Sequence, residues 1–474
     1  MRPSAALLLD EAWRYLGGDP AYLRSVTFTG RPDTLPARLP VTELAQATAA
    51  AAGAAASELA AVRAGGGPGD AAAVAVDSEA VAIAFTSERH LRLNGAPQGG
   101  MDPLSKFFAC ADGLVRVHGN YPHHRAALFR ALEITGTPDD PAETVALALL
   151  GLPVAVVEER VRAAGGLAFA VREPDAWRAH PHGSALSDAP LLTRRRIGAA
   201  APGRLGPLPT AGGTAPAPPA AGVRVLDLTR VVAGPVGTRT LALLGAQVLR
   251  IDPPHLPEIP AQHLDTGLGK RSALLDLRTP DGLRTLDDLL AEADVVVAGY
   301  RPGALARFGL APDELAARHP GLVVATLSAW GTSGPWSDLR GFDSLVQAPT
   351  GIARIEADGD EHPGVLPAQA LDHGTGYLVA AGVLRALTDR QADGVGAHVE
   401  FALARTAAWL LRHHDPDEHL PRFPRRVAAA DHLGHRTARQ GRLAYALPPF
   451  ALDGGPTDWS EPPVPWGSSP PTWW

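Results

Sequence analysis

The chain has 474 residues, with 43 lysine and arginine residues against 50 aspartate and glutamate residues. Its formal net charge of −7 gives no case for binding nucleic acid or an anionic membrane. The length predicts two or three domains with a large buried core, and the single cysteine, Cys110, excludes an intramolecular disulfide.

The N-terminal hundred residues alternate helical patterns with loops rich in glycine and proline. A helix is expected near residues 7–16. The alanine-rich segment 43–62 also carries Gln46, Ser57 and Glu58, so it predicts a helix of a soluble protein and not a membrane span. The chain does not open with a basic region followed by an apolar signal core, and we expect a cytoplasmic protein.

A smaller α+β unit is expected over residues 101–198. Residues 105–132 predict a strand, an Asp-Gly turn, a second strand and a helix. Gly165 and Gly166 are compatible with a substrate loop or with a helix C-cap, which is the commoner use. Residues 199–221 are mostly alanine, proline and glycine, a composition that predicts a linker with partial polyproline character.

Residues 222–252 read GVRVLDLTRVVAGPVGTRTLALLGAQVLRID. A β-branched run, a Gly-Pro turn, a helical pattern ended by Gly245 and a second apolar run predict a βαβ unit. Such units bind ligands at the carboxyl end of the first strand, beside the helix N-terminus. The turn has one glycine and not three, so the pattern does not indicate a nicotinamide cofactor.

Five ordered blocks resemble the class III CoA-transferases, the CaiB–BaiF family. They read LDLTRVVAGPVGTRTLALLGAQVLRID, GLGKRSALLDLRTPDG, ADVVVAGYRPGALARFGL, LRGFDSLVQAPTGI and LDHGTGYLVAAGVLRAL. Five blocks in the family's order are more specific than any single motif. The resemblance implies an α/β fold with a doubly wound parallel sheet. This sheet would belong to a large CoA-binding domain over residues 222–474 that ends in an extended C-terminal segment. The smaller α+β domain would accompany it.

In this family the large domain precedes the small one, so the order here resembles a permutation. Residues 1–100 resemble a degenerate partial repeat of the large domain, because a helix, a glycine turn, a strand and a helix recur after residue 370 in the same order. Glu43 takes the place of Asp372, but Gly374 and Gly376 have no counterparts, so the first copy is expected to be structural. Family members favour isologous dimers, and a homodimer is expected.

The resemblance implies that Asp372 is the catalytic nucleophile. The segment DHGTG, residues 372–376, matches the family's nucleophile block and is expected in a loop between Pro367 and a helix that starts near Tyr377. An aspartate before a helix is in itself equally an N-cap. As a nucleophile, its carboxylate would attack a thioester, and flexible neighbouring glycines would bring backbone N–H groups to the oxyanion. No metal and no permanently bound cofactor is implied; coenzyme A enters as a substrate.

The family's coenzyme A contacts fall on matching positions of the other blocks. These positions are Val232, Ala233, Leu275, Asp276, Leu277, Arg278, Gly299, Tyr300, Arg301, Arg307, Arg340, Gly341, Phe342 and Asp343. The four arginines suit pairing with phosphate groups. The implied function is transfer of coenzyme A between an acyl-CoA and a small carboxylic acid.

Two other functions remain as alternatives. A 2-methylacyl-CoA racemase of the same superfamily carries Gly-His-Asp where this chain has Gly341-Phe342-Asp343, and Phe342 cannot act as a base. A non-catalytic CoA-binding or scaffold protein is compatible with the degenerate N-terminal copy and with Val232, where some transferases have glutamine. Glycine at position 299, where many members have asparagine, together with Val232 argues against a specialised formyl or oxalyl transferase.

Overall fold

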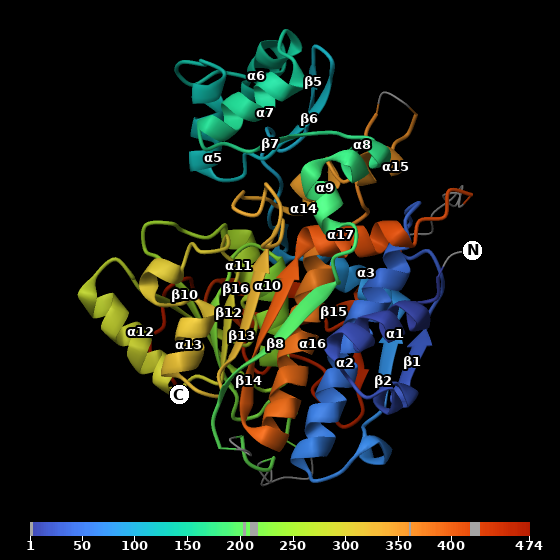
Figure 1. The fold of residues 1–474 in the computed structure, drawn as a ribbon, viewed down its shortest axis with the longest axis vertical. Coiled ribbons are helices and arrows are strands. Elements are labelled where there is room, and N and C mark those ends of the chain that lie inside the picture. The colour runs from blue at the N-terminus through green and yellow to red at the C-terminus, as the bar shows by residue number, and fades with distance from the viewer. Residues whose placement is uncertain (1–2, 202–204, 209–216, 360–361, 418–426) are drawn as a thin grey trace.

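The computed structural model describes residues 3–201, 205–208, 217–359, 362–417 and 427–474. A body built on one large sheet carries a small α+β lobe, and the N-terminal elements form a layer on the flank of the body (Figure 1). The small lobe contains β5 to β7 and α5 to α7, and the N-terminal layer contains α1 to α4 with β1 and β2.

The large sheet has seven strands in the order β11-β10-β9-β12-β13-β14-β8, and only the pairing of β14 with β8 is antiparallel. The chain leaves β9 toward β10 and β11 on one side and reaches β12, β13 and β14 on the other. The strands are β8 (Leu192–Ala199), β9 (Arg224–Leu228), β10 (Gln247–Asp252), β11 (Lys270–Leu274), β12 (Val295–Ala298), β13 (Val323–Ser328) and β14 (Val395–Ala402).

Both faces of this sheet are covered by helices. Val295 and Val297 of β12 pack into one core and Val296 packs into the other, because successive strand residues point to opposite faces. The first core includes α10 (Ala233–Leu243) and α16 (Ala370–Asp393), and the second includes α12 (Pro280–Glu292) and α13 (Pro312–Arg318). The predicted doubly wound α/β fold is therefore confirmed, and its switch point lies between β9 and β12, where ligands of such sheets bind.

Strand β8 joins the large sheet as its antiparallel edge. The expected boundary between small domain and linker, at residue 198, falls inside this strand, and the domain division as a whole stays a prediction. No strand was predicted at β8, because its three consecutive arginines do not follow the apolar pattern of a buried strand. Each forms an ion pair, Arg194 with Asp389, Arg195 with Asp313 and Arg196 with Asp393, and charged side chains on an edge strand discourage pairing with other chains.

The small lobe has the strand, turn, strand and helix predicted for residues 105–132. Its elements are β5 (Phe107–Cys110), β6 (Gly113–Val117), α5 (Pro122–Ala131), α6 (Pro141–Leu150), α7 (Val154–Ala163) and β7 (Ala168–Ala170). Gly165 has φ +82°, and the amide of Gly166 donates to the carbonyl of Val161. The two glycines thus form a helix C-cap, and they also line the cavity described below.

The N-terminal layer is organised around helix α2 (Val41–Arg63), which is buried on nearly all sides and packs along α16. Small residues all round the helix allow this, and a helix without a polar face belongs in a protein interior. The other elements are α1 (Ala5–Leu16), β1 (Val26–Thr29), β2 (Val74–Asp77), α3 (Ser78–Phe85) and α4 (Ser87–His90). The order α2, β2, α3 parallels α16, β14, α17 (Leu403–Arg412), although common descent of the two segments stays a prediction.

The C-terminal tail packs back on the large sheet and its helices, as expected. The indole N–H of Trp459 donates to the carbonyl of Arg239, that of Trp466 to Asp252 and that of Trp473 to the carbonyl of Leu289. Within the described ranges, no helix combines the length and the apolar character needed to cross a membrane.

Candidate active site

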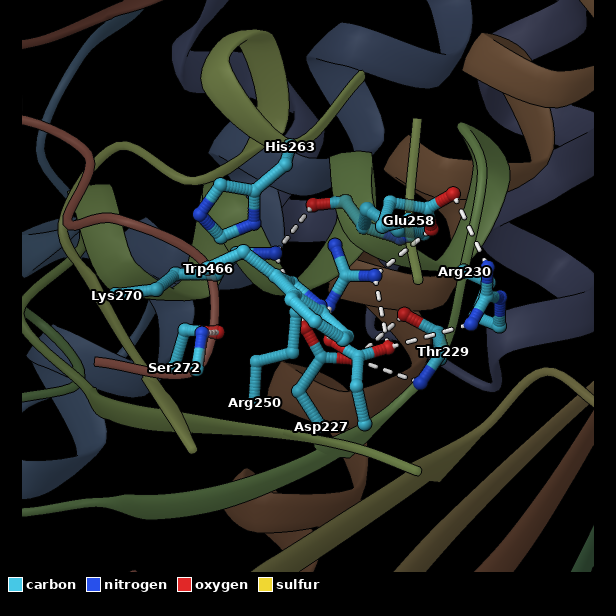
Figure 2. Close-up of polar contacts among 12 residues, drawn as sticks. Asp227, Thr229, Arg230, Arg250, Glu258, His263, Lys270, Ser272 and Trp466 are labelled. Carbon is cyan, nitrogen blue, oxygen red and sulfur yellow. Dashed lines mark hydrogen bonds and ion pairs between the residues drawn. The ribbon is translucent and has the colours of Figure 1, made fainter. Parts of the chain in front are cut away.

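The first turn after β9 is fixed by the buried carboxylate of Asp227. One oxygen accepts hydrogen bonds from Thr229, and the other accepts from Thr238 at 2.6 Å and from the ammonium of Lys270 at 3.0 Å (Figure 2). Burial lowers the pKa of Lys270 to about 8, and Asp227 partly offsets that effect. The carboxylate thereby ties the first two sequence blocks, which lie on β9, α10 and β11, into one unit.

The backbone of the same turn is strained at Val231. Val231 has φ +69°, a conformation rare for a β-branched side chain, and its amide donates to Glu258 at 3.1 Å. The side chain of Glu258 is 1% exposed and also accepts hydrogen bonds from Arg250 and Arg230, and Figure 2 shows Glu258 facing these groups. Burial alone would raise the pKa of Glu258, but the two guanidinium groups hold it below its usual value.

A cavity of about 190 Å³ opens at the carboxyl ends of β9 and β10. Leu228, Ile251 and Phe308 give it apolar walls. Six predicted coenzyme A contacts line the same cavity: Leu275, Asp276, Leu277, Arg278, Tyr300 and Arg307. Flat aromatic and aliphatic walls with few polar groups suit a planar base such as adenine.

Two further predicted contacts, Arg301 and Arg340, line a second cavity of about 170 Å³ between the small lobe and the body. Tyr300 borders the first cavity and the adjacent Arg301 borders the second, so the two cavities follow one another along the chain. Three more predicted contacts lie at the crevice: Val232 precedes α10, Ala233 begins it, and a Cβ at Gly299 would lie 3.3 Å from Thr229.

Phe342 forms the meeting point of the body and the small lobe. The ring of His118 stacks on it, with centroids 4.0 Å apart and planes inclined by 9°, and Tyr121 and His124 complete an aromatic cluster. Burial lowers the pKa values of His118 and His124 to about 3, so both imidazoles are neutral near pH 7. Gly341, beside Phe342, lets the chain approach β13 and the residues after it closely, because a Cβ there would lie 2.6 Å from that of Ala329.

Asp343 and Asp372 occupy one buried site. One oxygen of Asp343 accepts hydrogen bonds from the amides of Leu371 at 2.9 Å and of Asp372 at 3.0 Å. Burial raises the pKa of Asp343 to about 6. Burial, then the charges of Asp343 and Glu88, raise the pKa of Asp372 well above its usual value, because neighbouring buried carboxylates resist being ionised together.

Asp372 lies in the first turn of α16, and the expectation of a loop before a helix near Tyr377 is wrong. The helix starts at Ala370 because the carboxylate of Asp343 accepts the free N–H groups of its first turn, as an N-cap side chain would. A cap that comes from so distant a position cannot be read from the local pattern. The helix N-terminus in turn favours negative charge on Asp372.

Gly374 and Gly376 lie in the interior of α16, so the expectation of flexible glycines beside the nucleophile is also wrong. A Cβ at Gly376 would lie 2.5 Å from the carbonyl oxygen of Ala233, and one at Gly374 would lie 2.9 Å from the side chain of Leu44. The two glycines therefore let α16 approach α10 and α2 closely. Their effect on the site is to set the position of the helix that carries Asp372.

Sequence reasoning missed several residues that border this site. Glu88 of α4, in the N-terminal layer, places an oxygen 3.9 Å from His373, and its charge helps to raise the pKa of Asp372. His118 and Tyr121 belong to the segment HGNYPHH, whose density of rings was a visible signal. Nothing in the sequence positions of His118 and Tyr121 indicated their contact with Phe342, which lies more than two hundred positions further along the chain.

A doubly wound sheet with a cavity at its switch point and a buried carboxylate at a neighbouring helix N-terminus define an α/β protein with a site for a nucleotide-sized ligand. The model of CoA-transferase family III matches residues 221–440. This part of the chain is therefore similar to the domain of that family.

Similarity to curated proteins covers the same part of the chain. A probable fatty acyl-CoA transferase of Mycobacterium tuberculosis is 34% identical over 41% of this chain and 53% of its own length. A succinate–glutarate CoA-transferase of Agrobacterium fabrum is 31% identical over 39% of this chain and 51% of its own length. The chain thus spans about half the length of these relatives. A crystal structure of a hypothetical protein from Mycobacterium tuberculosis aligns with 42% of this chain and 58% of its own, at 36% identity and a TM-score of 0.39.

Proposed function

We propose that the protein transfers coenzyme A from an acyl-CoA to a carboxylic acid, with Asp372 as the nucleophile. The observation that carries the proposal is the buried carboxylate of Asp372 at the N-terminus of α16, beside Asp343, in a part of the chain that is similar to CoA-transferase family III. The predicted coenzyme A contacts that line two adjacent cavities support it.

The reaction needs four substitutions at carbonyl carbons. An oxygen of Asp372 attacks the thioester carbon, the C–S bond breaks, and CoA thiolate leaves a mixed anhydride. The thiolate attacks the aspartyl carbon and expels the donor carboxylate, which leaves an aspartyl-CoA thioester. The acceptor carboxylate attacks that thioester and releases the thiolate. The thiolate then attacks the acyl carbon of the new anhydride, which frees both Asp372 and the new acyl-CoA.

The chain's own groups have separate tasks in this scheme. The carboxylate of Asp372 must be ionised to attack, and the amide that it donates to Asp343 fixes its backbone. The cluster of Phe342, His118 and Tyr121 shields the site from water, which would otherwise hydrolyse the anhydride. Bound CoA would expose its thioester at the end of the path that starts at the apolar cavity.

Intact-protein mass measurement after incubation with a panel of acyl-CoAs tests the proposal. We expect a covalent adduct on the wild-type protein, mapped to Asp372 by peptide analysis. Asp372→Asn should show no adduct and lose transfer by more than about a thousandfold, while it still binds coenzyme A. Asp281→Asn, in the first turn of α12, serves as the control. Substantial transfer by the Asp372 variant would refute the mechanism.

The alternatives make different predictions. A scaffold protein would bind coenzyme A without forming any adduct, and a racemase would exchange an α-proton without moving coenzyme A. We propose a homodimer as the assembly, to be tested by light scattering. A fully active species of about the chain's own mass, 49.3 kDa, would reject it.

A further inference from the structure

We propose that Arg162 of the small lobe joins Arg301 and Arg340 of the body in a phosphate-binding subsite, so that the small lobe closes over the phosphate-bearing part of coenzyme A. The inference rests on the proposed function and adds to it a residue from outside the matched family domain. It assigns a role to the cavity between the two parts of the molecule.

The cavity is built from both sides of the interface. Arg162 lies in the last turn of α7, Arg301 follows β12 and Arg340 precedes α14 (Asp343–Gln347). Residues 165–169 form the remaining wall on the small-lobe side. A ligand in this space of about 170 Å³ would contact the small lobe and the body at the same time.

The charge in this cavity is uncompensated. Among the described residues, none of the three guanidinium groups forms an ion pair with a carboxylate, whereas Arg278 of the neighbouring cavity is paired with Asp276 at 2.8 Å. The pKa of Arg340 lies below its usual value because of burial and of repulsion by Arg301. Arg301 donates one hydrogen bond to the carbonyl of Asp338, which leaves its charge without a carboxylate partner. Guanidinium groups that share a cavity without carboxylate partners favour an oxyanion of high charge, since each can donate hydrogen bonds to it.

The order of the cavities along the site identifies the anion. The apolar cavity that suits a planar base ends at Tyr300, the charged cavity begins at Arg301, and Arg340 leads through Phe342 to Asp343 beside the nucleophile. Coenzyme A has the same order of groups, with adenine, phosphates and then the thiol-bearing arm. Its phosphates would therefore lie between Arg301 and Arg340 and contact Arg162 on the side of the small lobe.

Closure follows from the same charges. Without an anion, Arg162 brings a third positive charge to an interface that already holds two, which opposes docking of the small lobe. A bound diphosphate neutralises the three arginines, so that the repulsion between the small lobe and the body is replaced by attraction of both to the same anion. Binding of coenzyme A would thus stabilise the interface at which His118 already covers Phe342.

Calorimetric titration of the full-length protein with coenzyme A and with pantetheine, which lacks phosphates, tests the subsite. Arg162→Ala should weaken binding of coenzyme A roughly tenfold, as expected for loss of one charge-assisted pair, and leave binding of pantetheine unchanged. Arg160→Ala is the matched control, because Arg160 lies in the same last turn of α7, is exposed and does not line the cavity.

Three results would overturn the inference. Equal affinities of the Arg162 and Arg160 variants for coenzyme A would reject the subsite and leave the transferase proposal standing. Equal weakening with pantetheine would show a general structural defect. An increase in KM for dicarboxylic acceptors alone would assign the cavity to the acceptor acid. A wild-type protein that does not bind coenzyme A would instead refute the proposed function itself.

Discussion

The hydroxyl of Tyr121, in the small lobe, donates a hydrogen bond of 2.8 Å to Glu258 in the body. The other oxygen of that carboxylate accepts the amide of Val231 in the strained turn before α10. A single buried carboxylate therefore connects docking of the small lobe with the backbone that is predicted to contact coenzyme A. The guanidinium of Arg230, 5.6 Å from the centre of the Tyr121 ring, adds a cation–π contact to the same junction.

Tyr121→Phe tests this connection, since it removes the hydroxyl and keeps the ring. We expect a loss of about 1.5–3 kcal/mol in the free energy of unfolding, the usual contribution of a hydrogen bond to a charged group. We also expect a several-fold higher KM for acyl-CoA. Tyr15→Phe, on an exposed position of α1, is the control. Thermal unfolding and steady-state kinetics measure both effects, and an unchanged KM would separate the junction from ligand binding.

The buried pair of carboxylates predicts a pH dependence. Asp372 must be ionised to attack, and its pKa is raised by burial and by Asp343, so kcat/KM should rise with pH as Asp372 loses its proton. Asp343→Asn removes the neighbouring charge and should move this limb about one to two pH units lower. A pH profile of kcat/KM measures the shift, with Asp281→Asn as the control. An unmoved limb would contradict the coupling.

The same pair affects stability with a definite sign. Carboxyl groups whose pKa values are raised in the folded state contribute stability below their unfolded pKa values and lose that contribution as pH rises through the folded ones. With a folded pKa of about 6 for Asp343, Tm of the wild-type protein should fall between about pH 4 and pH 7. The fall should be smaller in Asp343→Asn, and a fall of equal size would show that other groups dominate.

The position of α16 depends on the absence of a side chain at residue 376. Gly376→Ala would place a Cβ 2.5 Å from the carbonyl of Ala233, so α16 and α10 must move apart. We expect a destabilisation of about 1–3 kcal/mol, typical of overpacking, with reduced transfer. Gly69→Ala is the control, because nothing lies within 4 Å of a Cβ at that position. Denaturant unfolding measures both variants, and a neutral Gly376 variant would contradict the packing role.

The sequence predicted the fold where periodicity and local turns carry the information. The apolar, β-branched run of β9 and the helix after it were readable, as were the strand pair and helix of residues 105–132, because neighbouring residues determine them. Strand β8 was not readable, since its pairing with β14 and the ion pairs of its arginines are formed by distant segments. The predicted start of α16 was wrong for the same reason, because Asp343 supplies the cap of this helix from outside it.

The candidate site divides in a similar way. Positions copied from ordered motifs, such as Leu277, Tyr300 and Arg307, line a common cavity, because the motifs belong to one sheet edge. The groups that complete the site come from other parts of the chain, namely Tyr121 from the small lobe and Glu88 from the N-terminal layer. Tertiary packing alone brings these residues to the motifs, so no local pattern contained them.

The protein should not exchange the α-proton of a 2-methylacyl-CoA. Phe342 occupies the place of one racemase base, and the imidazole of His118 stacked on it has a pKa lowered to about 3, which makes it a weak base. We expect no deuterium at the α-carbon after incubation in D₂O, as measured by mass spectrometry. Incorporation at a catalytic rate, lost in Asp372→Asn, would support the racemase alternative.

Complementation between chains tests where the small lobe docks. Within one chain, Tyr121 reaches Glu258 and His118 covers Phe342, so we expect each small lobe to serve the proposed nucleophile, Asp372, of its own chain. A mixture of Asp372→Asn chains with chains whose lobe contacts are broken by Tyr121→Ala and His118→Ala should therefore remain inactive, even in a homodimer. The mixture is refolded together, and transfer is compared with that of each variant alone and of wild-type protein treated in the same way. Recovery toward about a quarter of the wild-type activity would show exchange of small lobes between subunits, because half of the dimers are hybrids and each hybrid has one site that combines an intact nucleophile with an intact lobe from the other chain.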